Sequence, residues 1–568
     1  MASSSQSSEE CNRLVFEAVN ENLTSKFALA KSTYSVIELL TSLIQRNENG
    51  ETPLVVAMKK KFFPVMDELI LWMSANNVYN TEEFKPMFLI AINEIAHHIP
   101  LKDLIEYFIK DSFCLDDLGN EPCFQFIGQV FINSITFTRE DKIIALELFG
   151  AINFLSEDPK IPEMFCWKEA MTLRYLPQDS DTLLPKKLDV YVPSEAFSIV
   201  FGSAVEVMSI EELDLLQEDM DSILSLLDYQ LFIRRLKIQA LLVIRRISVQ
   251  ANLEHLHRLY LEGLLAFGCS HKNFDSIIGD GKILMNTCQL ILEQMDGFAS
   301  RKFSNVFRKT FQLISDFFLM TVLHPPNSPE RGELSYTNLM IPTKFIASVN
   351  DYSDSRDGCE DKDRRHFVIY ACFYLFLLNY ISPQLTNEEK QKLEEPYSHF
   401  IRHFSPERTT TVLHLAVLGR KRATENYEVL QTLQLMLKLG ADPNAIDEKG
   451  RTPLHILAGS KKLHLEEYRL AFKELVNAEC HLDSAADDGE TVLSILKKTL
   501  MEYGDDYVHP YFVSLINTVL PLSCYSAQVI RRHGIPFDGD RIPVHLQSFV
   551  AYHSAKGELK IKENFEFC

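Results

Sequence analysis

The sequence lacks several features that would place it in a familiar functional class. Its eleven cysteines include no Cys-x-x-Cys pair, so neither a zinc knuckle nor a thiol redox pair is indicated, and we expect no metal or other cofactor. Basic residues number 57 against 78 acidic ones, a balance that excludes a general nucleic-acid binder. The longest apolar run, 367–378, is shorter than the roughly 18 residues of a membrane span, so we expect a buried helix and no membrane partner.

Targeting signals are also missing. The polar N-terminal residues contain no apolar segment of the kind that a secretory signal needs, and the terminal Cys568 is not fourth from the end as in a prenylation box. Together with unpaired cysteines, this predicts a protein with reduced thiols in the cytoplasm, and also in the nucleus.

Motifs of common enzymes are absent as well. The sequence contains no Gly-x-Ser-x-Gly and no His-Glu-x-x-His, and Gly279-Asp-Gly-Lys282 lacks the remaining residues of a phosphate-binding loop. The plentiful Asp and Glu residues do not cluster into an acid–base pair. We therefore expect a binding protein without catalytic residues.

Three related segments indicate ankyrin repeats in the C-terminal half. Thr411–Ala416, Thr452–Leu457 and Thr491–Leu496 share one pattern and recur at spacings of 41 and 39 residues. Each ankyrin unit buries its apolar face against the next copy, so the repeats are expected to stack. In this motif Thr and His tie turns together by hydrogen bonds, which favours a structural role for His414 and His455 over catalysis or metal binding.

The N-terminal region carries weaker versions of the same opening. Residues 49–57 (NGETPLVVA) combine a tight turn with a proline that enters a helix, and 85–92 and 118–124 look like eroded copies. The middle of the chain is helical without these turn motifs, and 142–150 and 167–175 are predicted to be facing helices with small residues at their crossing.

The fold class predicted is all-α, a solenoid of ankyrin repeats and tetratricopeptide-like helical pairs. The domains expected are a disordered tail (1–10), degenerate ankyrin-like repeats (11–149), a tetratricopeptide-like domain (150–323), a linker with a buried helix (324–398), ankyrin repeats (399–520), a terminal helix pair (521–553) and a loose tail (554–568).

Four arginines on one predicted helix invite a functional interpretation. Arg234, Arg235, Arg245 and Arg246 could form a phosphate or RNA site. The alternative is a solvated helix face paired with the excess carboxylates of the chain, and the acidic composition favours it.

Two short amphipathic helices close the ordered part of the chain. Leu522, Ser526, Val529 and Ile530 share one face of the first, which Gly534 and Pro536 end. Pro543 suits the first turn of the second, in which Ile542, Leu546, Phe549 and Val550 form another stripe. Helices this short need a surface to dock on, in this chain or in a partner.

The order of repeats, helical middle, second repeat block and helix pair resembles the Fem family of feminisation-factor ankyrin proteins. The resemblance covers most of the chain, including 145–151 (ALELFGA), 167–175 (WKEAMTLRY), 209–213 (SIEEL) and the second ankyrin block, and is densest at 521–553. Members of that family are substrate receptors of cullin-2 RING ubiquitin ligases.

The resemblance implies two partners at the terminal helices. Pro521, Leu522, Ser526 and Ile530 match an elongin-binding box, so Leu522, Ser526, Val529 and Ile530 are expected to bind elongin B/C. The second stripe matches a cullin box, and its expected cullin-2 contacts are Ile542, Pro543, Leu546 and Phe549.

The resemblance also implies a protein substrate. The N-terminal ankyrin domain of the family binds the C-termini of substrates, often around a terminal arginine. Acidic residues of the domain suit this role because their carboxylates pair with the guanidinium of that arginine. Here the candidates for that role are Asp111, Asp116, Asp117 and Glu121. Two alternatives stay open. One is a scaffold that has lost ligase coupling and folds its terminal helices back on the ankyrin block, and the other is a cryptic enzyme or phosphate-binding protein that uses the four arginines.

Overall fold

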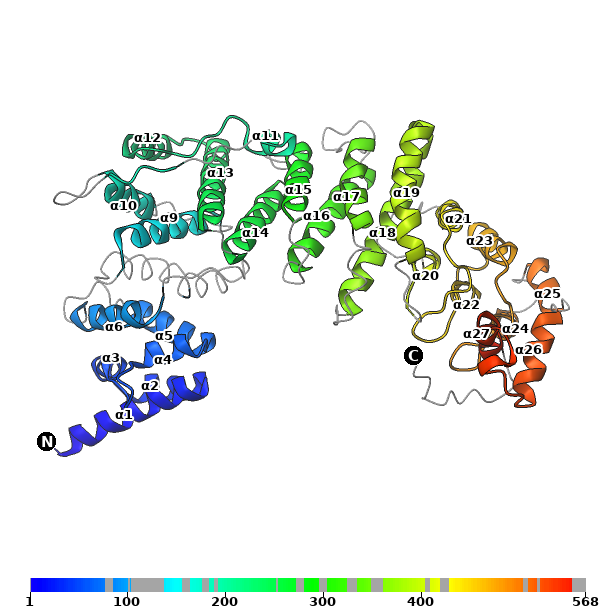
Figure 1. Ribbon diagram of the computed structural model, residues 1–568, viewed down its shortest axis with the longest axis horizontal. Coiled ribbons are helices and arrows are strands. Elements are labelled where there is room, and N and C mark those ends of the chain that lie inside the picture. Colours follow the sequence, from blue (N-terminus) through cyan, green and yellow to red (C-terminus); the bar gives the residue numbers. More distant parts are fainter. Residues whose placement is uncertain are drawn as a thin grey trace. The chain divides into compact units, whose positions relative to one another are not determined.

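The structure is a computed structural model of the full chain. It describes residues 2–76, 85–100, 103, 137–155, 164–175, 183–187, 193–251, 254–271, 280–295, 304–323, 335–348, 361–403, 409–418, 429–503, 509–517 and 522–553. Every regular element among these residues is a helix, apart from two isolated β-bridges (Figure 1). The chain divides into two compact units, Met1–Gln294 and Met295–Cys568, and each is described by itself.

The first unit opens with a small helical stack. Its helices are α1 (Ala2–Glu21), α2 (Thr24–Thr33), α3 (Val36–Ile44), α4 (Pro53–Lys59), α5 (Phe63–Ala75) and α6 (Lys85–His98). They enclose one core, to which α1 contributes Cys11, Val15, Ala18 and Val19. The expectation of a disordered tail over 1–10 is wrong, because α1 begins at Ala2. Packing of the apolar stripe from Cys11 onward stabilises this helix. Extending a formed helix by its polar first turns costs little free energy, because the unfavourable nucleation step has already been made.

The predicted ankyrin opening at 49–57 is a tight turn that leads into α4. Oδ1 of Asn47 accepts hydrogen bonds from the backbone N–H groups of Asn49 and Glu51, both at 2.9 Å. Gly50 has φ +78°, a left-handed conformation that glycine adopts without strain. Pro53 then occupies the first turn of α4, where its missing N–H costs nothing.

The rest of the first unit packs around α9. Its helices are α9 (Arg139–Leu155), α10 (Met164–Tyr175), α11 (Glu195–Phe201), α12 (Ile210–Asp221), α13 (Leu226–Ala251), α14 (Glu254–Ser270) and α15 (Gly281–Met295). The helices α9 and α10 face each other as predicted, and a Cβ at Gly150 would lie 2.5 Å from Cδ1 of Trp167. The indole Nε1–H of Trp167 donates to the carbonyl of Glu147 (3.0 Å). Only glycine lets the two helices approach this closely.

The second unit begins with four longer helices and continues into the ankyrin pairs. Its elements are α16 (Ser304–Leu323), α17 (Tyr336–Ser348), α18 (Asp361–Ile381), η4 (Ser382–Gln384), α19 (Asn387–His403), α20 (Val412–Leu418), α21 (Val429–Lys438), α22 (Pro453–Ala458), α23 (Glu466–Asn477), α24 (Val492–Tyr503), α25 (Pro510–Ile516), α26 (Leu522–Arg532), η6 (Gly539–Arg541) and α27 (Val544–Tyr552). The apolar run at 367–378 lies in α18, with Tyr374 and Leu375 fully buried. The helix is buried as predicted, and α18 contacts the ankyrin block through α20 and α21.

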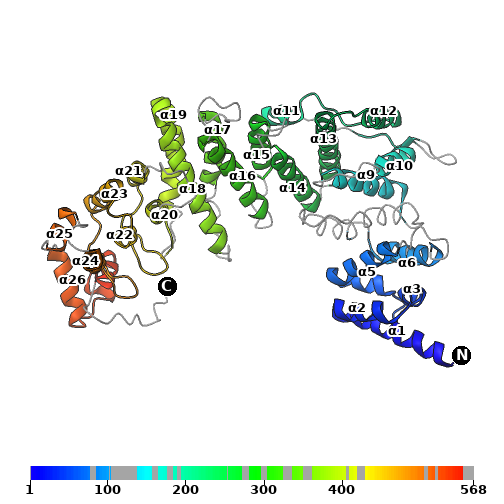
Figure 2. The ribbon, with the colours of Figure 1, turned by 180° about the vertical axis from the view of Figure 1, so that it is seen from behind.

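Helix pairs stack in order along the ankyrin block. The helix α20 packs on α21 and α22, α22 packs on α23 and α24, and α24 packs on α25 (Figure 2). The turn before α22 repeats the one before α4, since Oδ1 of Asp447 accepts from the N–H groups of Lys449 and Arg451 at 2.9 Å each. The predicted fold class, an all-α protein built from ankyrin repeats, is confirmed for the described residues. Among the helices described, none has the length and hydropathy required to cross a bilayer.

Candidate functional site

The first terminal helix, α26, has one buried face and one exposed face. Cys524 and Ala527 are buried, and Nε2 of Gln528 donates to Oδ2 of Asp483 in the ankyrin block (2.5 Å). On the opposite face Leu522 is 81% exposed, and Tyr525, Ser526 and Val529 are exposed as well. The helix is therefore docked by its small residues and presents its larger apolar side chains to solvent.

The predicted end of α26 is formed by Gly534 in the left-handed conformation (φ +57°). The N–H of Gly534 donates to the carbonyl of Arg531 (3.3 Å), and the N–H of Ile535 donates to that of Ile530 (3.0 Å). These two bonds form a Schellman motif, which satisfies carbonyls that the last turn of a helix leaves unpaired. Ile530 is half-buried beneath this turn.

The second terminal helix, α27, packs on α26. Pro543 is exposed and is the residue immediately before the helix, with Ile542 half-buried beside it. Val544 is 77% exposed and Leu546 is also exposed, whereas Val550 is buried. The side chain of Gln547 donates to the carbonyls of Gly539 (2.8 Å) and Ile542 (3.1 Å), which fixes the loop before α27.

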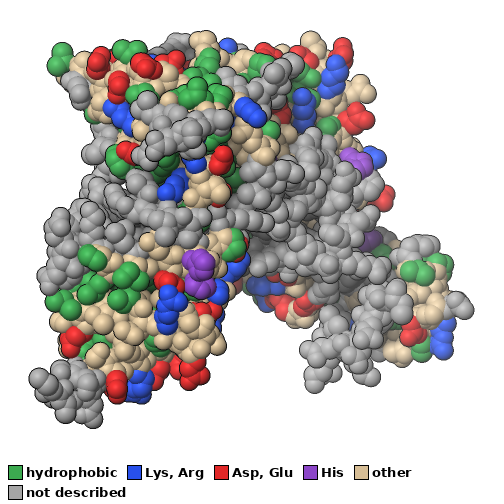
Figure 3. Space-filling view, turned by 60° about the vertical axis from the view of Figure 1, so that its left-hand side comes forward, with side chains coloured by type: hydrophobic (Ala, Val, Ile, Leu, Met, Phe, Trp, Pro, Cys, Tyr) green, Lys and Arg blue, Asp and Glu red, His purple; other side chains and the backbone are tan. Residues whose placement is uncertain are grey.

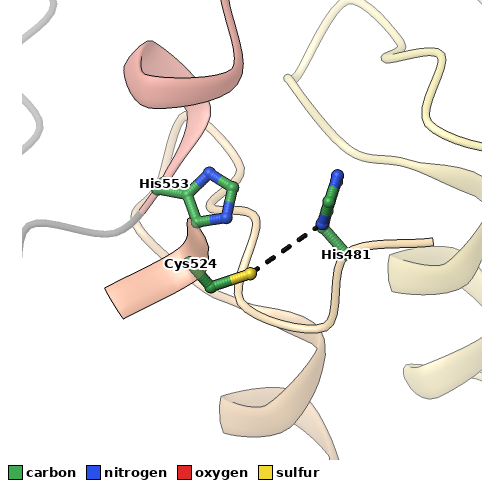
Figure 4. Close-up of side chains that lie close together, drawn as sticks. All are labelled: His481, Cys524 and His553. Atoms are coloured by element: carbon green, nitrogen blue, oxygen red, sulfur yellow. Dashed lines mark hydrogen bonds between the residues drawn. The ribbon is translucent and has the colours of Figure 1, made fainter. Parts of the chain in front are cut away.

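A histidine cluster joins this helix pair to the ankyrin block (Figure 4). His481 and Asp483 come from the loop after α23, Cys524 from α26, and His553 from the residue after α27. The ring of Phe549 packs against both imidazoles, with centroid distances of 4.8 Å to His481 and 4.1 Å to His553. The backbone of His553 forms a β-bridge with Ser484. We call His481, Asp483, Cys524 and His553 the anchor cluster.

Burial controls the protonation of the anchor cluster. It raises the pKa of the Cys524 thiol to about 12, and Asp483 nearby adds to this rise. Burial alone would raise the pKa of Asp483, but His553 and Gln528 outweigh it and the pKa is lowered. Burial, together with the neighbouring His553, lowers the pKa of His481.

The ankyrin histidines have the structural role that the motif predicts. Nδ1 of His455 lies 2.8 Å from Oγ1 of Thr452, and its Nε2 lies 2.9 Å from the carbonyl oxygen of Ser484. His414 makes the equivalent contacts with Thr411 and the carbonyl of Arg451, both at 2.8 Å. In each histidine Nδ1 is thus held within its own turn, and Nε2 ties that repeat to the next.

A cleft of about 410 Å³ opens beside these histidines in the ankyrin block. Its lining combines apolar and charged side chains from α20, α22, α24 and the intervening turns, including Leu418, Arg451, Asp488 and Glu490. His455 reaches this cleft, but its ring nitrogens are occupied by Thr452 and Ser484 and are not free to act as a base.

The arginines of α13 do not form a shared anion site. Arg246 is buried and binds Glu206 (2.9 Å) and Glu147 (2.7 Å), while the exposed Arg235 pairs with Asp219 (2.6 Å). Arg245 lies over the ring of Phe197. The prediction of carboxylate partners is confirmed for Arg235 and Arg246, but the prediction of a solvated face is wrong for Arg246. The side of α13 that carries Arg246 is covered by other parts of the unit. Its charge is tolerated there because Glu147 and Glu206 neutralise it.

Glu147 is the centre of this buried ion network. Besides Arg246 it binds Arg174 through two hydrogen bonds (2.8 and 3.0 Å), and Lys186 binds Glu206 at 2.8 Å. Burial opposes ionisation of Glu147, but the guanidinium groups of Arg246 and Arg174 outweigh it and its pKa is lowered. On the face in Figure 3, described Lys and Arg side chains are likewise interspersed with Asp and Glu.

The predicted site residues differ in their exposure, and some of them lie outside the described residues. Leu522, Ser526, Val529 and Leu546 lie at the surface of the helix pair, whereas Phe549 contributes to the anchor cluster instead of projecting freely. Asp111, Asp116, Asp117 and Glu121, the candidates for substrate binding, lie outside the described residues, as does Pro521.

Sequence reasoning missed the anchor cluster. Its members are 43 and 29 residues apart along the chain, counted from His481 to Cys524 and on to His553, and no metal or catalytic motif has such spacings. Only the stacking of the last ankyrin pair against the terminal helices brings them together.

Comparison with known proteins gives a consistent set of relatives. No family model matches the chain. Among curated proteins, fem-1 homolog A of Danio rerio is 23% identical over 435 residues, which cover 75% of this chain and 63% of that protein. Fem-1 homolog C of Xenopus laevis is 23% identical over 425 residues, covering 73% and 61%, and fem-1 homolog C of Homo sapiens is 24% identical over the same length and shares. The chain thus spans about three fifths of the length of the curated relatives it matches.

Proposed function

Because the chain is a divergent member of the Fem-1 family of ankyrin-repeat proteins, we propose that it is a substrate-recognition subunit of a cullin-2 RING ubiquitin ligase. In this role it has no catalytic residues and binds elongin B/C, cullin-2 and a protein substrate, in the cytoplasm or nucleus. The observation that carries the proposal is the exposed apolar face of α26, whose opposite face is fixed to the ankyrin block.

Exposure of this face has a physical cost that a partner would remove. Single apolar side chains at a protein surface are normal, but Leu522, Ser526 and Val529 are aligned along one side of a docked helix. Burial of a leucine side chain contributes about 1.5–3 kcal/mol. A helix-binding groove on elongin C would gain this energy without rearranging α26, since the helix is already formed and held.

The second helix supplies the surface for cullin-2 in this proposal. Val544 and Leu546 are exposed on α27, and Pro543 is exposed just before it. Phe549 is committed to the contacts with His481 and His553, so its part is to hold α27 in place rather than to enter the partner. The contact with cullin-2 then centres on Ile542, Pro543 and Leu546, with Val544 beside them.

The substrate is expected at the N-terminal repeats. A substrate whose C-terminus carries arginine would pair with carboxylates there, for which Asp111, Asp116, Asp117 and Glu121 remain the candidates. A screen of peptide C-termini against the full chain tests this part, and the prediction fails if binding does not depend on the terminal residues.

The elongin contact is tested by titrating the full chain with purified elongin B/C. We expect Leu522→Asp to weaken binding at least about tenfold, because tenfold corresponds to about 1.4 kcal/mol and a buried leucine contributes more. The control is Leu224→Asp, which changes a leucine that is 96% exposed in the first unit and should leave binding unchanged. Absence of elongin binding, or equal binding by Leu522→Asp, contradicts the proposal.

The cullin contact is tested separately. Leu546→Asp should retain elongin B/C but lose recruitment of cullin-2 to the assembled complex. The rival function is a scaffold without ligase coupling whose terminal helices fold back on the ankyrin block. The docking of α26 through Gln528 and Asp483 agrees with that alternative, but the alternative also requires the elongin-box side chains to be buried. The exposure of Leu522 disfavours that alternative, and recovery of neither partner by the unmodified chain would restore it.

A further inference from the structure

The anchor cluster contains an arrangement of donors that goes beyond the proposed function. We propose that His481, Cys524 and His553 bind one zinc ion, with Asp483 as the fourth ligand, and that this ion clasps the terminal helix pair to the ankyrin block. The donors come from three separate parts of the second unit: the loop after α23, the helix α26 and the end of α27 (Figure 4).

The donor atoms are close enough to share an ion. One ligand atom from each of His481, Cys524 and His553 lies within 4.8 Å of the other two, and Sγ of Cys524 is 3.9 Å from Nδ1 of His481. Zinc–sulfur and zinc–nitrogen bonds of about 2.3 and 2.0–2.1 Å place tetrahedral ligands about 3.4–3.6 Å apart. Side-chain movements of roughly 1 Å would therefore complete the site, within the reach of small χ adjustments.

The imidazole of His553 is already oriented as a ligand. This side chain is 1% exposed, and its Nδ1 contacts the carbonyl oxygen of Phe549 at 2.6 Å. That contact places the ring proton on Nδ1 and leaves the lone pair of Nε2 directed into the cluster. Nε2 of His553 makes no hydrogen bond of acceptable geometry although it is fully buried, which is costly unless something binds it. Metal-bound histidines are commonly oriented by such a carbonyl.

Asp483 has the same combination of one held and one free atom. Its Oδ2 accepts a hydrogen bond from Gln528, while its buried Oδ1 makes no hydrogen bond and lies 3.3 Å from Nε2 of His553. The side chain is therefore positioned by one oxygen, and the other faces Nε2 of His553. These two atoms attract each other only when His553 carries a second proton, whereas a cation between them would bind both.

The chemistry of the donors selects the kind of ion. One thiolate, two imidazoles and one carboxylate match the nitrogen and sulfur preference of zinc, whereas magnesium and calcium prefer oxygen ligands. On binding, the Cys524 thiol releases its proton to solvent as the zinc–sulfur bond forms, and the two negative ligands neutralise the divalent ion. Four protein ligands in a buried position leave no coordination place for a substrate, so the site would be structural.

The test uses the full chain, purified in reduced form and loaded with zinc or with cobalt. After dialysis we expect about one zinc per chain by mass spectrometry of the metal. Cobalt should give the thiolate-to-metal charge-transfer band and the intense visible bands of a tetrahedral site. These measurements need no variant, so the proposal fails if the unmodified chain retains no zinc and shows no charge-transfer band.

Variants then assign the site. Cys524→Ser and His553→Gln should each lose the bound zinc and the cobalt charge-transfer band. The matched control is Cys480→Ser, because Cys480 is a buried cysteine of the same block whose thiol donates to the carbonyl of Pro443 (3.1 Å) outside the cluster. Retention of zinc by Cys524→Ser and His553→Gln, or its loss in Cys480→Ser alone, overturns the assignment.

A stability measurement separates this inference from the proposed function. A chelator should lower the unfolding temperature of the unmodified chain and of Cys480→Ser, and leave that of Cys524→Ser unchanged, because only a bound ion links metal to folding. Elongin binding is read in a separate titration. A chain that binds elongin B/C without zinc would refute the clasp alone, and one that binds zinc without elongin would refute the ligase role alone.

Discussion

The ion network of α9, α10 and α13 and the terminal helix pair place opposite kinds of side chain in unusual positions. In the network, Glu147, Glu206 and Arg246 are buried, and each is paired at hydrogen-bonding distance. In the helix pair, Leu522 and Val544 are exposed, while buried polar atoms of Asp483 and His553 make no hydrogen bond. Charged groups are satisfied internally in the first region, whereas apolar and polar groups are left unsatisfied in the second.

Under the proposed function, this difference separates a part of the molecule that is complete from one that binding partners would complete. A buried charge is tolerated only with its counter-charges in place, so the network needs nothing from outside the chain. An exposed leucine and a buried imidazole nitrogen without a hydrogen bond, such as Nε2 of His553, both lower their free energy when something binds them. The comparison therefore predicts that changes in the network act on folding and changes in the helix pair act on binding.

The largest effect is expected from Arg246→Met. Loss of the guanidinium leaves Glu147 and Glu206 short of positive charge in a buried site, which costs about 3–5 kcal/mol of the free energy of unfolding. Urea denaturation of the full chain, followed by circular dichroism, measures this loss. The further change Glu206→Gln should recover part of it, because one uncompensated carboxylate is removed.

The control for that experiment lies on the same helix. Arg235 pairs with Asp219 at the surface, and Arg235→Met should cost at most about 1 kcal/mol. If Arg235→Met and Arg246→Met lowered the free energy of unfolding equally, burial of the network would not explain the contribution of Arg246 to stability.

A second, smaller effect is expected from mild acid. Burial lowers the pKa of His455 to about 4, against about 6.5 in the unfolded chain. Above pH 6.5 both states are neutral and the stabilisation is complete, and it is lost as the pH falls from 6.5 toward 4 because the unfolded state binds the proton first. At pH 5 the titration of this histidine should have lowered the free energy of unfolding of the ankyrin block by roughly 2 kcal/mol.

The network should not follow the ankyrin block over that range. The pKa of Glu147 is lowered below its usual 4.5, so its contribution is present above 4.5 and disappears only at more acidic pH. Hydrogen exchange at pH 7 and pH 5, corrected for intrinsic rates, should show loss of protection in α22–α24. The first unit should lose protection over the same range only around α14, because burial also lowers the pKa of His271 to about 4. The variant His455→Gln should show a smaller change with pH, and an unchanged pH dependence would contradict the assignment.

The smallest effect on folding is expected from Val529→Glu. Since Val529 is about half exposed on α26, the free energy of unfolding should change by less than about 0.5 kcal/mol, while elongin binding is lost. Thermal unfolding and titration with elongin B/C measure the two quantities. The matched change Ala527→Glu, on the buried face of the same helix, should destabilise its docking instead. The comparison between regions fails if Val529→Glu unfolds the second unit.

The sequence predicted those parts that depend on local pattern. The ankyrin turns, the Thr–His contacts of His455 and the close crossing at Gly150 follow from short motifs or residue size, and the structure confirms them. The C-terminal end of α26 was predictable because glycine favours the left-handed conformation found at Gly534.

Tertiary packing accounts for what the sequence did not predict. Arg246 was assigned to a solvated face because its partner Glu147 is 99 residues away, and no local pattern shows that α9 covers it. The anchor cluster escaped notice for the same reason, since its residues meet only when the terminal helices dock. Likewise, the helix at residues 2–10 depends on packing of the later turns of α1, which composition alone does not reveal.

The exposed leucine face of α26 also bears on how much of this protein a cell can keep. If elongin B/C covers this face as proposed, a chain made in excess of that partner carries Leu522 and Val529 uncovered, and such surfaces promote self-association and recognition by quality-control machinery. We therefore expect the usable amount of the chain to follow the supply of its partner rather than its own rate of synthesis. The side chains that recruit the complex would in this way also set its stoichiometry.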